Sequence, residues 1–481
     1  MTDGSVLPMK LGNANGGKWP WYKGNVRSGE IMVIDTSLAT PSSKVQTLQI
    51  TLHAKAKAEP SYRFYSLWDK IYRADILEVA YKRCRHNNGA HGVDNETFAD
   101  IETRGIEKWL GKLQQELRDK TYNPKPLRRV WIPKADGKSK RPLSIACIKD
   151  RVVQMAMLLV LEPIFEADLL PEQYGFRPNV DAKMAIRRVY YHITQYGRME
   201  IIDTDLKEYF TSIPHGDLLK CISRRVADKQ ILQLIKRWLI VPIMEESNNG
   251  NVIVNTRAKD THRGLAQGSP ISPLLSNCYF RRFILAWRNF GYQRKFDARV
   301  VNYADDYVIC CSPNKAMSAN EAMRRIISRI GLEVNQDKTQ VIDLRNKGHF
   351  DFLGYSIGSF VNKDGKYYYG TKPSKKSLKK VIQKIHDETS RQWLLSTAEI
   401  RVNAINLILR GWCGYFNQGP VVPSYKIIRN YTEKRLRRWL VNKHKIRGTT
   451  GYRQFPDEYL YDQLGLYKLA QVRADVPRAK A

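Results

Sequence analysis

Features that would place the protein in a membrane or outside the cell are missing from this sequence. No run of about 18 uninterrupted apolar residues occurs, and the best apolar stretch, around Met155 to Leu161, ends at Glu162. The N-terminus lacks the apolar core of a secretory signal. The 7 cysteines are scattered without a CxxC pair, which argues against a disulfide framework and a cysteine-based zinc site. We therefore expect a cytoplasmic protein without a membrane partner.

Acidic residues are also scarce. The 481 residues include 47 Asp and Glu against 80 Lys and Arg, a net charge of +33. A compact protein keeps such a surplus most easily when a polyanion neutralises it, so nucleic acid is the first candidate partner and an anionic membrane surface the second. Hydrophobic residues make up 43% of the chain, which favours extended cores over disorder, and the length suggests roughly three domains.

Composition and hydrophobic spacing divide the chain into segments. Residues 1–41 are rich in Gly, Ser, Asn and Pro and are predicted to form a flexible leader, with Met32 as an alternative start. Helical spacing runs from about Ser42 to Arg118, and strand-like runs follow at 128–132 and from Arg141, with a turn predicted at Asp136-Gly137 between them. Residues 371–481 carry 23 Lys and Arg against 8 Asp and Glu, with strong helical spacing, which predicts a basic helical domain after about Gly370.

Two further strand patterns end in carboxylates. Residues 199–206 (MEIIDTDL) alternate like a buried strand, and 299–311 (RVVNYADDYVICC) predict a hairpin with acidic residues at its turn. Strands interleaved with long helices make the chain α/β or α+β. Asp203 lies two residues before Asp205, so alternation could place both on one face.

The pair Asp305-Asp306 together with Asp205 is the strongest chemical signal. Phosphoryl transfer to a hydroxyl needs two hard cations roughly 3.5–4 Å apart, and carboxylates with substrate phosphates suffice to hold them. The alternative interpretation is that two adjacent Asp residues simply cap a hairpin, because Asp favours turns. The flanking strand residues and the order of the other motifs favour the metal site.

Ten sequence blocks identify a family resemblance. The chain resembles the reverse transcriptase and maturase encoded by bacterial group II introns, from about Ser42 to the C-terminus. The blocks occur in the family's order: GVDNETF (92–98), RVWIPKADGKSKRPLSIACIKDRVVQ (129–154), PEQYGFRP (171–178), DTDLKEYFTSIPH (203–215), GLAQGSPISPLLSN (264–277), YADD (303–306), GLEVNQDKT (331–339), FDFLGYSI (350–357), LRGWCGYF (409–416) and KRLRRWLVNKH (434–444).

The resemblance implies an α+β right-hand polymerase fold. It places fingers and a palm with a ferredoxin-like sheet in residues 42–370, a basic α-helical thumb or maturase domain X in 371–447, and a short DNA-binding-like tail in 448–481. That tail resembles those of endonuclease-lacking, class C-like members, so we expect no cleavage of the bottom strand of the target.

The resemblance also implies the roles of individual residues. Asp205, Asp305 and Asp306 match the catalytic carboxylates that hold two Mg²⁺ ions, with the Leu206 carbonyl nearby, and Asp203 matches a hydrogen-bonding neighbour. The residues that match the dNTP site are Lys134, Arg141, Phe210, the aromatic gate under the sugar, and Gln267.

The Lys134–Arg141 spacer looks one residue longer than usual, so Lys140 could share the role of Arg141. A solvated basic loop is the alternative. Ala266 stands where the family usually has Pro, and LSIAC (143–147) replaces the usual LGIPT.

Further matches concern the nucleic acids. Tyr303, Phe352, Leu353 and Gly354 match primer and template contacts. Basic residues of the C-terminal domain are expected to bind RNA: Lys375, Lys376, Lys379, Lys380, Arg435, Arg437 and Arg438.

The function implied is RNA-directed DNA synthesis from a primer 3′-hydroxyl, together with help for intron splicing and mobility. Its partners would be group II intron RNA, an RNA template with a DNA primer, target DNA and dNTPs. Two alternatives remain: a domesticated relative in repair or phage defence, and an RNA-binding maturase without polymerase activity. Intact Asp205, Asp305 and Asp306 argue against the second.

Overall fold

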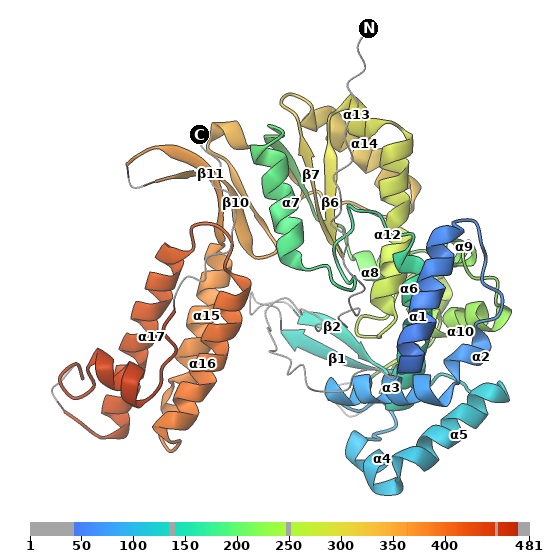
Figure 1. Ribbon diagram of the computed structural model, residues 1–481, viewed down its shortest axis with the longest axis horizontal. Coiled ribbons are helices and arrows are strands. Elements are labelled where there is room, and N and C mark those ends of the chain that lie inside the picture. Colours follow the sequence, from blue (N-terminus) through green and yellow to red (C-terminus); the bar gives the residue numbers. More distant parts are fainter. Residues whose placement is uncertain (1–42, 134–139, 247–251, 363, 448–450, 470–481) are drawn as a thin grey trace.

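The computed structural model describes residues 43–133, 140–246, 252–362, 364–447 and 451–469 (Figure 1). It is a mixed assembly of helices and three sheets. The N-terminal part is helical, as its spacing predicts, and its first three helices pack against the long, buried helix α6, Ile148–Glu166. The five preceding helices are α1 Ser43–Ala58, α2 Trp68–Ile71, α3 Ala74–His86, α4 Phe98–Arg104 and α5 Ile106–Arg118. None of the described helices is both long and apolar enough to cross a bilayer.

A four-stranded sheet of order β2-β1-β4-β5 stands beside these helices. β1 and β2 are antiparallel and contain the two strand-like runs predicted near Arg128 and from Arg141. The turn predicted at Asp136-Gly137 lies outside the described residues. The strands are β1 Leu127–Pro133, β2 Lys140–Ile145, β4 Ile243–Glu246 and β5 Val252–Asn255.

The central sheet is antiparallel, with order β6-β7-β3-β8. Alternation divides its side chains between two cores: Tyr307 and Ile309 face one, whereas Val308 and Cys310 face the other. Each face is apolar, which explains the near-continuous hydrophobic runs in the sequence. The strands are β3 Glu200–Thr204, β6 Arg299–Tyr303, β7 Asp306–Cys311 and β8 Gln340–Asp343.

Helices cover both faces of the central sheet (Figure 1). α12 Ser272–Asn289 and α14 Ala316–Arg329 pack on one face, and α7 Ala182–Thr194 packs on the other. Five shorter helices complete this part: α8 Tyr209–Ser212, α9 His215–Ser223, α10 Lys229–Leu239, α11 Arg257–Thr261 and α13 Tyr292–Lys295.

A third sheet leads to the C-terminal helices. Its order is β11-β10-β9, with β9 His349–Phe352, β10 Tyr355–Val361 and β11 Tyr367–Pro373. The basic segment then forms the helices that its spacing predicts, which lie apart from the other helices in Figure 1. These are α15 Lys375–Glu388, α16 Ala398–Tyr415 and α17 Val422–Lys443, with short helical turns at Leu344–Asn346, Arg391–Trp393 and Tyr459–Gln463.

One buried carboxylate fixes a helix to the central sheet. Glu200, at the start of β3, accepts hydrogen bonds from the backbone N–H groups of Asn314, Lys315 and Ala316 at 2.7, 3.1 and 2.9 Å. These N–H groups belong to the start of α14, where a negative charge is favourable. Arg345 also donates to Glu200, at 3.0 Å.

Replacing this carboxylate tests its contribution. Glu200→Ala should lower the free energy of unfolding by about 2–3 kcal/mol, because it leaves buried N–H donors without an acceptor. Glu321→Ala, which removes an exposed carboxylate from the same helix, should change it by less than about 0.5 kcal/mol. Urea denaturation of both variants measures the difference, and equal losses would contradict the anchoring role.

Candidate active site

The turn between β6 and β7 presents the two adjacent aspartates. Tyr303 pairs with Asp306 across the hairpin, so Ala304 and Asp305 form a two-residue turn, as the sequence predicts. Ala304 has a φ of 59°, the left-handed conformation that tight hairpin turns require. β3 pairs with β7 through Thr204 and Tyr307, so Asp205, which follows β3, lies at the same end of the sheet.

A neighbouring loop holds this turn in place. A Cβ atom on Gly175 would lie 2.3 Å from the Ala304 nitrogen, so only glycine allows the loop to approach so closely. Tyr174 N–H donates to the Asn302 carbonyl at 2.8 Å, and the Asn302 amide donates to the Ala304 carbonyl at 2.8 Å. The Asn277 amide binds the Gly175 carbonyl at 2.7 Å. The PEQYGFRP block therefore supports the acidic turn, a role that its sequence alone did not reveal.

A second loop, part of the GLEVNQDKT block, holds Asp205. The Asp205 carbonyl accepts from Asn335 N–H at 2.8 Å, and the Asp205 N–H donates to the Thr339 hydroxyl at 3.3 Å. The Lys338 ammonium lies 3.4 Å from the Asp205 carboxylate. Leu206 forms a bridge to Val334. Sequence reasoning recognised the block and missed these contacts, because they join segments more than a hundred residues apart.

The carboxylates at this end of the sheet act on one another. Asp305 and Asp306 reach solvent but are closely surrounded by protein on their other sides. Burial, and next the charges of Asp305, Asp205 and Asp203, raise the pKa of Asp306 to about 7. Burial also raises the pKa of Asp305, against the opposing charge of Arg141.

Asp203 belongs to the same electrostatic group. Burial raises its pKa to about 6, a hydrogen bond from the Gln340 amide at 3.5 Å opposes the shift, and the charge of Asp205 adds to it. The four aspartates thus form a cluster with excess negative charge at one edge of the sheet.

These residues fit a divalent cation by their chemistry. A cluster of carboxylates whose charges oppose one another is stabilised by a cation with oxygen ligands. Across the described residues, however, no three acidic, histidine or cysteine side chains are placed to enclose a metal ion by themselves. An ion here would take further oxygen ligands from water or a substrate, which suits Mg²⁺.

Arg141 and Gln267, predicted for the dNTP site, lie together beside this cluster. The Arg141 Nε is 3.5 Å from the Gln267 side-chain oxygen, and its charge acts on Asp305. The Ser144 N–H donates to the Gln267 carbonyl at 2.8 Å. Gly268, at a φ of 111°, lets this loop approach β2, because a Cβ there would lie 2.8 Å from the Ser144 carbonyl.

The remaining predicted dNTP residues have different outcomes. Lys134 lies outside the described residues, and Lys140 is exposed at the start of β2. Phe210 is buried, 9% exposed, beside Tyr209, and its carbonyl accepts from Leu265 N–H at 2.6 Å. Phe210 is therefore part of the core, and its expected role at the sugar stays a prediction.

The predicted primer-positioning turn connects the third sheet to the helical bundle. Leu353 and Gly354 have φ values of 49° and 80°, and Phe352 is buried. The Tyr415 hydroxyl donates to the Leu353 carbonyl at 2.8 Å, and the Ser377 hydroxyl to the Gly354 carbonyl at 2.9 Å. Tyr303, the residue that directly precedes the acidic turn in the sequence, is half-buried.

The expected RNA-binding cations separate into two groups. Lys375, Lys376, Lys379, Lys380 and Arg438 are exposed. Arg435 is half-buried and binds the hydroxyl and carbonyl of Thr389, each at 3.1 Å.

For Arg437 the expectation was wrong. Its side chain is 1% exposed and binds the Phe455 carbonyl at 2.9 Å and the Asp457 carboxylate. The sequence alone did not show that residues 451–463 cover this face of α17.

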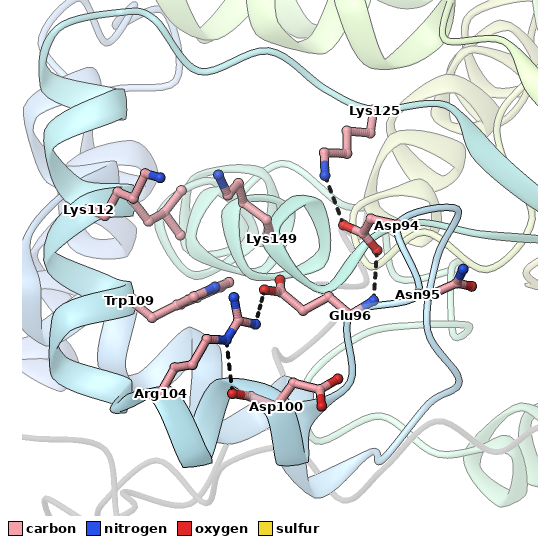
Figure 2. Close-up of a pocket in the computed structure, with 10 residues that line it drawn as sticks. Asp94, Asn95, Glu96, Asp100, Arg104, Trp109, Lys112, Lys125 and Lys149 are labelled. Atoms are coloured by element: carbon pink, nitrogen blue, oxygen red, sulfur yellow. Dashed lines mark hydrogen bonds and ion pairs between the residues drawn. The ribbon is translucent and has the colours of Figure 1, made fainter.

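A cavity of about 560 Å³ lies away from these residues, where the GVDNETF block meets α4 and α5 (Figure 2). Its charges are paired internally: Lys125 with Asp94 at 3.1 Å, and Arg104 with Glu96. Trp109 forms part of the wall. With Lys149 bound to Glu116 at 3.0 Å, most of the charge around this cavity is paired, and the carboxylate cluster remains the candidate active site.

Comparison with known proteins gives two family matches. Residues 132–357 match the reverse transcriptase (RNA-dependent DNA polymerase) model, and residues 378–455 match the maturase-specific domain of group II introns. The first match contains the acidic cluster, and the second contains α16, α17 and most of α15.

Individual relatives match different shares of the chain. Protein YkfC of Escherichia coli is 32% identical over 348 residues, which cover 65% of this chain and 88% of that protein. The group II intron-encoded protein LtrA of Lactococcus lactis is 24% identical over 470 residues, covering 79% of this chain and 75% of LtrA. Nuclear intron maturase 1 of Arabidopsis thaliana is 25% identical over 199 residues, covering 37% of this chain and 27% of that protein. The chain therefore belongs to the reverse transcriptase and maturase family of group II introns.

Proposed function

We propose that this reverse transcriptase extends a DNA primer on an RNA template at the cluster of Asp205, Asp305 and Asp306. The observation that carries the proposal is the meeting of these carboxylates, from β3 and from the β6–β7 turn, at one edge of the sheet. Arg141, whose charge acts on Asp305, and Gln267 beside it would bind the triphosphate of an incoming dNTP. Such an arrangement serves phosphoryl transfer, which needs positioning and charge stabilisation more than covalent chemistry.

The protein groups have distinct parts in this reaction. The planar guanidinium of Arg141 would bind phosphate oxygens, and Gln267 would line the nucleotide pocket. Phe210 would restrict space under the sugar, so that a 2′-hydroxyl is excluded by shape. Lys338 would balance the charge of Asp205 while no substrate is bound. Lys134 would add a second cation at the triphosphate.

The cofactor would be Mg²⁺, held by the three aspartates and the Leu206 carbonyl. Reverse transcriptase domains normally use divalent metal ions, which would supply charge stabilisation for phosphoryl transfer at these residues. The excess negative charge of the cluster supports this assignment.

The architecture would be a right hand. Residues 42–370 would form fingers and a palm, with the β1–β2 sheet in the fingers and the central sheet in the palm. Residues 371–447 would be the thumb and maturase domain, and residues 448–481 a DNA-binding tail. The primer would contact Tyr303 and the 352–354 turn, which is bonded to α15 and α16.

The maturase match implies that the chain binds intron RNA. Lys375, Lys376, Lys379, Lys380 and Arg438 are exposed and would bind its phosphates. Target DNA would be the remaining partner, bound during intron mobility.

Removal of one carboxylate tests the reaction centre. Asp305→Ala should reduce primer extension on RNA template by at least about 10³-fold, because transition-state charge is no longer neutralised. Asp337→Ala, which removes an exposed carboxylate from a nearby loop, should retain extension. Binding of intron RNA should stay within a few fold in both variants. Extension by Asp305→Ala would contradict the assignment.

The charge of Asp306 gives a test that does not require activity. In metal-free buffer at about pH 8, wild-type Asp306 is ionised in the folded state although its folded pKa is raised to about 7, so folding is penalised. Asp306→Asn should then increase the free energy of unfolding by roughly 1 kcal/mol, a value reduced for solvent exposure. The gain should vanish below about pH 4, where the group is protonated in both states.

In the same experiment, Mg²⁺ should reverse the order of stability of the wild type and Asp306→Asn. It should raise the melting temperature of the wild type more than that of Asp306→Asn, because the variant has lost one ligand. Asp337→Asn is the matched control, and an equal Mg²⁺ effect in all three proteins would contradict metal binding at Asp306.

The glycine behind the acidic turn tests how strictly the geometry is required. Gly175→Ala should displace the turn and lower the extension rate by at least about tenfold, because small shifts at a reacting centre are costly. Gly216→Ala, where a Cβ meets nothing within 4 Å, should be active. Melting temperatures of both variants distinguish a local displacement from unfolding. Full activity in a folded Gly175→Ala protein would show that the close approach does not matter.

A further inference from the structure

A second group of cations lies beside a small cavity between α9 and α12. The cavity has a volume of about 50 Å³. The cavity lies away from the candidate active site along α12. Arg281 is nine residues, or about 14 Å of helix rise, beyond Ser272, where α12 begins near the Gln267 loop. The lining residues used below are Asp168, Cys221, Arg224, Arg225, Arg281 and Arg282.

Two of the four arginines are neutralised within the protein. Arg225 is buried, with its guanidinium 3.3 Å from the Asp168 carboxylate and bonded to backbone carbonyls, including that of Ala56 at 2.6 Å. Arg282 forms an ion pair with Asp217 at 2.9 Å and stacks over Tyr279.

Arg224 and Arg281 are not neutralised in this way. Arg281 donates its Nε–H to the backbone carbonyl of Asp168 at 2.7 Å, and neither arginine forms an ion pair among the described residues. Burial lowers the pKa of Arg281, and the charge of Arg224 adds to this effect. Asp168, the carboxylate on which the charges of both arginines act, is already paired with Arg225. The site therefore has unbalanced positive charge around a space of limited size.

We propose that Arg224 and Arg281 form an oxyanion site that binds one phosphate of the RNA backbone. The guanidinium fork matches phosphate geometry. The cavity volume suits a single phosphate group and is too small for a nucleobase. The net charge of +33 makes a polyanion the expected source. The proposal rests on the intron RNA binding proposed above and adds a contact surface separate from the acidic cluster and from α15–α17.

The thiol of Cys221, which lines the cavity, provides a chemical probe of anion binding. Cys221 is partly exposed, whereas the other six cysteines are buried. In the folded protein, alkylation by iodoacetamide should therefore occur mainly at Cys221, and a bound anion should slow it. Cys221→Ser should abolish this labelling, which verifies the assignment.

The experiment measures the Cys221 alkylation rate with inorganic phosphate, with a short RNA hairpin, and with chloride at equal ionic strength. Wild-type protein should be labelled at least about threefold more slowly with millimolar phosphate, and at much lower concentrations of the RNA. In the Arg224→Gln/Arg281→Gln variant both effects should disappear. Arg325→Gln/Arg329→Gln, which removes the same charge from exposed positions on α14, should behave like the wild type.

The outcomes separate the possibilities. Protection by phosphate and RNA that depends on the two arginines supports the site. Protection by phosphate without protection by RNA means a small-anion site and overturns the RNA assignment. If neither phosphate nor RNA slows the alkylation of Cys221, the proposal is overturned altogether. Asp305→Ala should lose primer extension and keep the protection of Cys221, so failure of this site and failure of the polymerase assignment are distinguishable.

Discussion

The pairing of β3 with β7 is the constraint on which the candidate active site depends. It fixes the ends of two strands that lie a hundred residues apart in sequence, and so brings Asp205 to the turn that carries Asp305 and Asp306. The cost is electrostatic, because burial, and next the charges of the neighbouring aspartates, raise the pKa of Asp306 to about 7. A bound cation would remove that cost and would couple metal binding to the stability of the protein.

The surroundings of the cluster make this costly arrangement rigid. The Gly175 loop packs directly against the turn, and the loop that contains Asn335 and Thr339 bonds to Asp205. Both faces of the sheet are covered by apolar cores, so the strands have little freedom to relieve the repulsion. Rigid support of this kind keeps charge-stabilising groups in position before the substrate arrives.

The sequence predicted local structure well, because strand alternation, helical spacing and the acidic turn are local patterns. The hairpin at 299–311, the strand before Asp205 and the basic C-terminal helices are all present. Contacts between distant segments were not predictable in this way. Lys338 beside Asp205, the Gly175 contact and the burial of Arg437 under residues 451–463 each depend on tertiary packing that no single segment encodes.

Iron-directed cleavage of the protein backbone tests the central claim most directly. Fe²⁺ replaces Mg²⁺ at oxygen-rich sites, and the hydroxyl radicals that it produces in the presence of ascorbate and peroxide cut the nearby chain. We expect the chain to be cut at two places, close to Asp205 and close to Asp305-Asp306. Excess Mg²⁺ should suppress both cuts. Cleavage at only one of these strand ends, or only elsewhere in the chain, would contradict a shared metal site.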